Sequence, residues 1–67
     1  MFYVTGTLQD GSGTLMTIKC ADAIEAANNY VNLGREGYAP TSIVGPDGNQ
    51  LSSEELMKAA VAQFNAR

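Results

Sequence analysis

The sequence predicts an α+β fold in the order β-β-α-β-β-α, and three observations support this prediction. Two early segments alternate apolar and polar residues with the two-residue period of a strand. Two later segments repeat apolar residues every three or four positions, as amphipathic helices do. Turn signals rich in Gly, Pro and Asp separate these segments, and no linker or internal repeat interrupts them. We therefore expect one compact α+β domain over residues 1–67.

Residues 2–8 and 14–20 are predicted to pair as an antiparallel β-hairpin. Each segment carries apolar residues on one face, and a loop with an odd number of residues is needed to bring the two apolar faces together. A three-residue loop with Gly11 or Gly13 in the left-handed conformation would do this. The apolar face would consist of Phe2, Val4, Leu8, Met16, Ile18 and Cys20.

Helical spacing follows in residues 21–34 and again in residues 53–66, and Gly37 is placed to end the first helix as its left-handed C′ residue. The predicted core stripe of the first helix is Ala23, Ile24, Ala27, Val31 and Gly34, with Tyr30 at its border. The predicted core stripe of the second helix is Met57, Ala60, Val61 and Phe64, with Leu56 beside it.

The segment between the helices is predicted to contain two short strands around a tight turn. Pro40 favours an extended entry into a strand at 41–44, and the turn at 45–48 has Pro at its second position and Gly at its fourth. Residues 49–51 would form a brief fourth strand. A right-handed crossover through the first helix then gives an antiparallel sheet of three or four strands, in the order 2-1-3-4, with both helices on one face.

The stretch from Gly45 resembles the later part of an EF-hand calcium loop, with Asp47, Asn49 and Glu55 near ligand positions. Gly45 would have to be the first ligand, however, and the Gly of the sixth position is missing. Ser52 as N-cap with Glu55 three residues later is a capping box. We therefore interpret the stretch as a turn followed by a capped helix, with a calcium-responsive switch as the alternative.

The composition argues against most enzymatic chemistry. The chain has no His and one Cys, so the commonest general base and any Cys/His zinc site are missing. The carboxylates fall in turns or in the first turn of a helix, where structural roles explain them. The GTLQDGSGT stretch lacks the G-K-[ST] ending of a phosphate-binding loop. We expect no enzyme, no metal and no cofactor.

The single Cys20 is expected to be a buried, inert thiol, with a reactive thiol near the start of the first helix as the alternative. One Cys favours a reducing compartment, and the start of the chain has no signal-peptide pattern. No stretch approaches the roughly 20 apolar residues of a membrane helix. A cytoplasmic location and no membrane partner are therefore expected.

The predicted outer face of the sheet is the candidate interaction surface, since both helices would cover the other face. It consists of Tyr3, Thr5, Thr7, Leu15, Thr17 and Lys19. A small domain near the lower size limit gains from a partner, so we expect a non-enzymatic protein-interaction module or a homodimer. The alternative is weak single-stranded nucleic-acid binding through Tyr3 and Lys19. Four cations in a chain of net charge −3 make nucleic acid the less favoured partner.

As a whole, the pattern resembles small bacterial β-β-α-β-β-α proteins of the domain-of-unknown-function type. The resemblance lies in a T-x-x-DG hairpin, a DAIEAANNYV helix leading to LGREGY, and a closing SIVGPDGNQLSSEEL. It covers most of the chain and implies a bacterial source and a stand-alone domain. It implies no activity for any residue.

Overall fold

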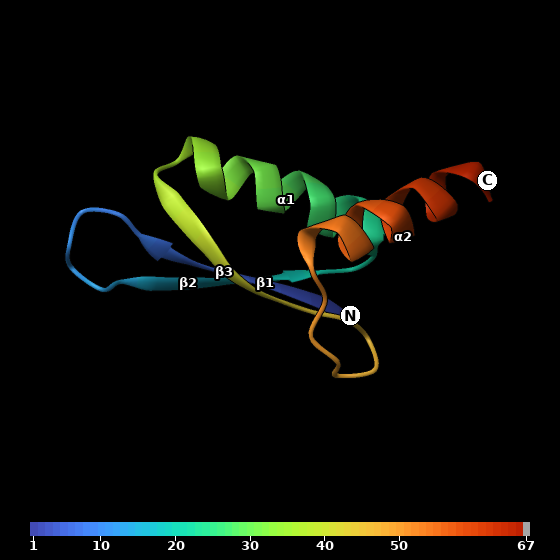
Figure 1. The fold of residues 1–67 in the computed structure, drawn as a ribbon, viewed down its shortest axis with the longest axis horizontal. Coiled ribbons are helices and arrows are strands. Elements are labelled where there is room, and N and C mark those ends of the chain that lie inside the picture. Colours follow the sequence, from blue (N-terminus) through green and yellow to red (C-terminus); the bar gives the residue numbers. More distant parts are fainter. Residues whose placement is uncertain (67) are drawn as a thin grey trace.

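The protein, represented by a computed structural model that describes residues 1–66, is built from one sheet and two helices (Figure 1). The sheet has the strand order β2-β1-β3, and both outer strands run antiparallel to β1. This confirms the α+β class and the predicted order of the first three strands. The elements are β1 (Phe2–Leu8), β2 (Leu15–Cys20), α1 (Ala23–Arg35), β3 (Tyr38–Val44) and α2 (Ser53–Asn65).

The register of the first hairpin agrees with the sequence prediction. Val4 lies opposite Ile18, so the apolar residues of β1 and β2 share one face. The pairing continues past the strand ends, since the Leu8 N–H donates to the Thr14 carbonyl at 2.8 Å. This leaves a loop of five residues, 9–13, an odd number, although we predicted three. The longer loop is accommodated because both of its glycines, Gly11 and Gly13, take a left-handed conformation, with φ of 84° and 74°.

The predicted fourth strand is absent from the described part of the chain, so the order 2-1-3-4 is wrong in its last member. Residues 49–51 make only one isolated bridge, between Val44 and Gln50. The tight turn before them is confirmed, because the Gly48 N–H donates to the Gly45 carbonyl at 3.0 Å. The return segment has no room to extend as a strand, since α2 begins at its N-cap, Ser52, directly after it.

Strand β3 is longer than predicted, beginning at Tyr38 rather than at residue 41. It therefore contains Pro40, which lies opposite Gly6 next to a register shift in the β1–β3 pairing. Proline cannot donate a ladder hydrogen bond, and β3 is an edge strand, where such a donor is dispensable. We had taken Pro40 as the entry to a strand at 41–44, and the observed strand begins two residues before Pro40.

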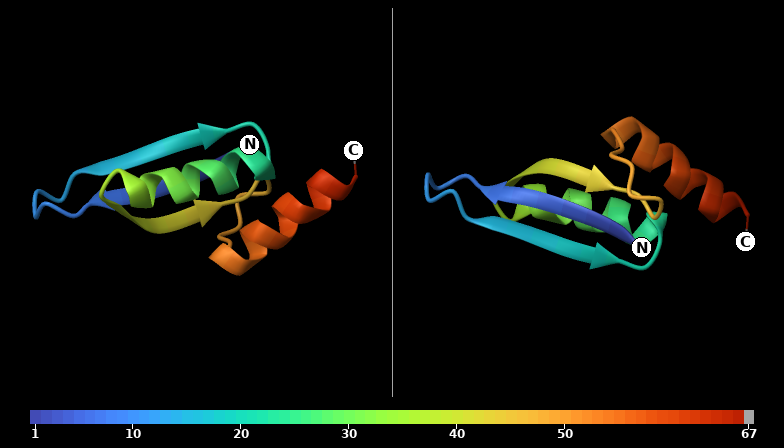
Figure 2. Two further views of the ribbon diagram at one scale, coloured as in Figure 1. Left: turned by 90° about the horizontal axis from the view of Figure 1, so that it is seen from above. Right: turned by 90° about the horizontal axis from the view of Figure 1, so that it is seen from below.

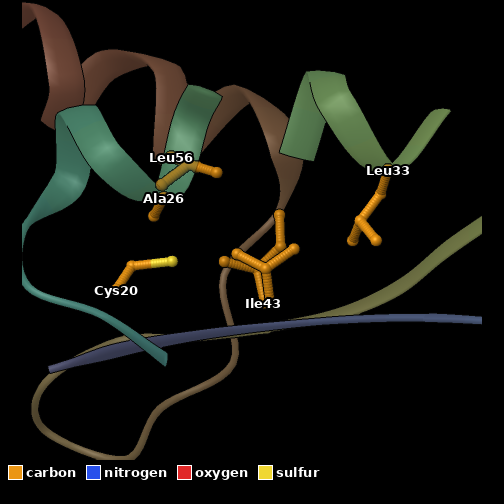
Figure 3. Close-up of a cluster of buried hydrophobic side chains, with 6 residues drawn as sticks. Cys20, Ala26, Leu33, Ile43 and Leu56 are labelled. Atoms are coloured by element: carbon orange, nitrogen blue, oxygen red, sulfur yellow. The ribbon is translucent and has the colours of Figure 1, made fainter. Parts of the chain in front are cut away.

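Helix α1 covers the inner face of the sheet, and a small core lies between them (Figure 3). The predicted stripe of α1 is correct in part. Ala23 is buried, and Ala27 and Tyr30 pack against the core. Ala26 and Leu33 are buried in place of Val31, which is 47% exposed, and Gly34, which is exposed as well. The buried cluster consists of Val4, Cys20, Ala26, Leu33, Ile43 and Leu56.

Helix α2 lies on the same side of the sheet as α1, but it packs beside α1 and does not cover the strands (Figure 2). Leu56 is its buried residue, and the Gln63 side chain accepts a hydrogen bond from the Ala23 N–H at 2.9 Å. The predicted core residues Val61 and Phe64 are instead exposed. The stripe we predicted for α2 therefore points mainly to solvent.

The exposure of Gly34 leads to a stability prediction. A Cβ built at this helical position would meet nothing within 4 Å, and its φ is not left-handed. Replacing Gly34 with Ala should therefore raise the free energy of unfolding by about 0.5–1 kcal/mol, because Ala loses less backbone entropy on folding. Chemical denaturation measures this change. A lower stability of the variant would mean that the position is crowded.

Candidate functional site

The six residues of the predicted interaction surface lie together as three cross-strand pairs, and we call them the sheet-face surface. The register places Tyr3 opposite Lys19, Thr5 opposite Thr17, and Thr7 opposite Leu15. Because side chains alternate along a strand, all six point away from α1. Figure 2 shows this face of the sheet uncovered by either helix.

The sheet-face surface is rich in hydroxyl groups and contains little apolar area. The Thr5 and Thr17 hydroxyls lie 3.0 Å apart in a hydrogen bond across the strands. Leu15 is 66% exposed and Tyr3 is 38% exposed, at opposite ends of the face. Threonine is also a good strand residue on a solvated face, so the hydroxyls have a structural explanation as well.

A second uncovered surface lies between the two helices, where residues of α1 and α2 line a shallow groove of about 250 Å³. Helical spacing extends this lining by Val31 on α1 and Met57 on α2, each one turn beyond a lining residue. We call these eight residues the helix groove: Ile24, Ala27, Asn28, Val31, Met57, Ala60, Val61 and Phe64.

The helix groove is the more apolar of the two surfaces. Phe64 is 67% exposed and Val61 is 58% exposed, while Val31 faces the same side from α1. We assigned these residues to the core from the sequence and so missed them as surface. The sequence did indicate this exposure through the width of the apolar arc, since the arc on each helix is wider than one packing contact can cover.

A second hollow is smaller, about 150 Å³, and lies between α1, β3 and the segment before α2. Tyr30, Ser42 and Gln50 contribute to its lining, which is mainly polar. Small-molecule sites usually occupy ~300–1,000 Å³, so both hollows are below the usual range for such a ligand. Surface contact with a macromolecule fits these shapes better.

The capping box at the start of α2 is confirmed. The Ser52 hydroxyl accepts from the Glu55 N–H at 3.1 Å, and the Glu55 carboxylate accepts from the Ser52 N–H at 3.0 Å. The Asp47 carboxylate accepts from the Asn49 side-chain amide at 2.9 Å. Both carboxylates are thus used within their own turn. In residues 1–66, no three Asp, Glu, Cys or His side chains are grouped to hold a metal ion.

The capping box predicts a pH dependence. The hydrogen bond from the Ser52 N–H lowers the pKa of Glu55 below its ordinary value of 4.5. The cap should therefore contribute stability above pH 4.5 and lose it as the pH falls through the lowered pKa. An NMR titration should give a Glu55 midpoint below 4.5 in the unmodified chain. In Ser52→Ala the midpoint should rise only part of the way, because the variant loses the hydroxyl but keeps the N–H that donates to the carboxylate. A Glu55 midpoint at or above 4.5 in the unmodified chain would contradict this prediction.

Cys20 is buried at the end of β2, as the prediction of an inert thiol requires. Burial raises the pKa of the Cys20 thiol. A hydrogen bond from the Asn29 amide, at 3.3 Å, lowers this pKa, and the nearby Glu25 and Asp22 carboxylates raise it; the net effect is a raised pKa. A thiol with a raised pKa is protonated at neutral pH. A raised pKa is the opposite of what the alternative, a thiol activated by the start of α1, requires.

The structure is that of a small α+β domain, with one uncovered sheet face and an apolar groove between its helices. No protein-family model matches this chain, and no curated protein or solved structure matches it either. None of the helices in the described part of the chain is long and apolar enough to cross a membrane. Function is therefore inferred from the two surfaces themselves.

Proposed function

We propose that this chain is a small non-enzymatic protein-interaction module that binds its partner through the helix groove. The observation that supports this proposal is the exposure of large apolar side chains along the groove. Val61 and Phe64 line it on α2, and the exposed Val31 lies one helical turn beyond the lining residue Ala27 on α1. The largest contiguous apolar patch on a monomeric protein, typically about 300–600 Å², is often a functional site. A surface of this kind is typical of a protein-binding site.

The composition of the groove agrees with this assignment. The core of a protein interface is depleted in charged residues and enriched in aromatic and Met side chains. The groove contains no charged residue, and it presents Phe64 and Met57. A concave wall beside an exposed aromatic ring also provides the pocket-and-anchor arrangement on which binding energy usually concentrates.

A non-enzymatic role agrees with how the acidic side chains are used. Asp10 and Asp47 accept hydrogen bonds inside their turns, and Glu55 caps α2. Such bonds hold the pKa of each of these carboxyls below its ordinary value, the reverse of what a general acid at neutral pH requires. A cytoplasmic location, favoured by the single Cys, forms part of this proposal.

Photo-crosslinking in cells tests the proposal. A photoreactive phenylalanine analogue at position 64 should give one discrete adduct with a protein, which includes a second copy of this chain. The same analogue at Gln9, an exposed polar position in the loop between β1 and β2, should give none and serves as the control. An analogue at Leu15 reports on the sheet-face surface. Adducts at position 15 alone would move the binding site to the sheet, and no adduct at any position would contradict an interaction role.

A second candidate function is weak binding of single-stranded nucleic acid by the sheet-face surface. The observation in its favour is that Tyr3 and Lys19 are direct cross-strand partners, so a ring for base stacking lies next to a cation. Binding should shift amide signals of residues 3–7 and 15–19, weaken with added salt, and vanish in Tyr3→Ala. Shifts that persist in Tyr3→Ala would contradict this function.

A further inference from the structure

We propose that the partner of the helix groove is a second copy of this chain, which docks face to face so that α1 of each copy lies against α2 of the other. This inference rests on the proposed function and names its partner. Three features of the groove lead to it: its shape, its area and the charges at its rim.

The shape of the groove suits a two-fold symmetric contact. Such a contact uses the same surface patch on both copies, so the patch must be complementary to itself. The helix groove carries both parts needed, a hollow between the helices and the projecting ring of Phe64 on its wall. Each copy can therefore insert its Phe64 toward the hollow of the other.

The area of the groove is sufficient for a weak dimer. Large aromatic side chains bury roughly 150–250 Å² each when fully covered. At the observed exposures, the four large side chains of the groove would remove on the order of 350 Å² of apolar surface per copy. Interfaces are about 60% apolar, so the full contact would be about 1,200 Å², the lower end of the stable range. These four side chains are Val31, Met57, Val61 and Phe64.

The charges at the rim allow the same arrangement. Glu54 and Lys58 lie on α2 next to Met57 and form an ion pair, with 3.6 Å between the Lys58 Nζ and the Glu54 Oε1. The charges beside the groove are therefore balanced within one copy, and two copies can approach face to face without bringing unpaired like charges of this pair together.

A partner of strongly opposite charge would not fit the groove as well. Electrostatic steering of such a partner requires a surface of one sign. The groove itself is uncharged, and its rim carries both signs. A small domain with few fully buried residues also gains apolar burial from a second copy, as other small domains do.

Sedimentation equilibrium of the purified chain under reducing conditions tests this inference. The mass should rise from 7.1 kDa toward twice that value with increasing concentration, which gives the dissociation constant of the dimer. Phe64→Lys should raise this constant at least ~30-fold, as loss of a central aromatic anchor does. Val31→Lys, which changes the α1 side of the same contact, should also raise the dissociation constant. Lys is favourable near a helix C-terminus, so both variants should keep the fold, which circular dichroism checks.

Leu15→Lys is the matched control, because Leu15 and Phe64 are exposed to the same degree, 66% and 67%. It removes an equal apolar exposure and makes the same change in net charge, but on the opposite side of the sheet. This variant should dimerise like the unmodified chain. Dimer loss in Leu15→Lys with retention in Phe64→Lys would overturn the proposal in favour of a sheet-face contact.

A mass of 7.1 kDa at every concentration would also overturn the inference. That result would leave the proposed function intact if the photoreactive group at position 64 still captured a different protein. A monomer without any adduct would remove both. The two failures are therefore distinguishable.

Discussion

Replacing Leu56 with Ala is expected to lower the free energy of unfolding by about 3 kcal/mol, within the range for buried Leu truncations. Leu56 is fully buried and is the residue of α2 that joins the main core cluster (Figure 3). A domain of 67 residues has a total stability of roughly 3–10 kcal/mol. The variant should therefore be partly unfolded or lose the ordered packing of α2.

Met57→Ala is the matched control for this prediction, because Met57 is the next residue and is 36% exposed. Its substitution should cost less than about 1 kcal/mol in the monomer, since exposed positions tolerate truncation. Urea denaturation at low protein concentration compares the two variants without contribution from a dimer. Equal losses in both would mean that α2 docks with a different face from the one described.

Replacing Gly6 with Val is expected to destabilise the fold by about 2 kcal/mol, as overpacking of a core does. A Cβ at Gly6 would lie 3.2 Å from the Tyr38 Cβ and 3.3 Å from the Leu33 Cδ1, both closer than ordinary contact. The two additional carbons of Val would then force α1 away from the sheet. The absence of a side chain at Gly6 is what allows Leu33 to pack so closely on β1.

Thr7→Val is the control that distinguishes the close contact at Gly6 from a general effect of placing Val in β1. Thr7 is the next residue of the strand and belongs to the sheet-face surface, on the side away from α1. Val is as favourable in a strand as Thr, so this variant should remain within about 0.5 kcal/mol of the unmodified chain. Thermal unfolding of the two variants measures the difference. A Gly6→Val variant as stable as Thr7→Val would show that α1 can move at little cost.

The local features of the fold could be predicted from the sequence because each depends on a few neighbouring residues. Apolar alternation required an odd hairpin loop, and Gly11 and Gly13 supplied its left-handed positions. The capping box is formed by Ser52 and Glu55 within one turn of helix. Gly37 also has a positive φ of 89° just past the end of α1, as predicted. The grouping of the sheet-face surface followed from the same register.

The packing of the helices, by contrast, was decided only by the tertiary structure. Both helices carry apolar arcs wider than one contact, so the spacing alone could not select Leu33 over Val31, or Leu56 over Val61. The selection depends on how wide the sheet is. Residues 49–51 form no strand, which leaves three strands in the described sheet.

Three strands spaced ~4.8 Å apart span about 10 Å, which is the diameter of one helix with its side chains. Helix α1 therefore covers the inner face of the sheet by itself, and α2 is left to pack at its side (Figure 1). One part of the apolar arc of α2 meets α1, and the remainder faces solvent. The sequence by itself determined both helices, their caps, the first three strands in outline and the hairpin register. The width of the sheet determined that Val61 and Phe64 lie at the surface, because a sheet one helix wide leaves no strand for them to cover.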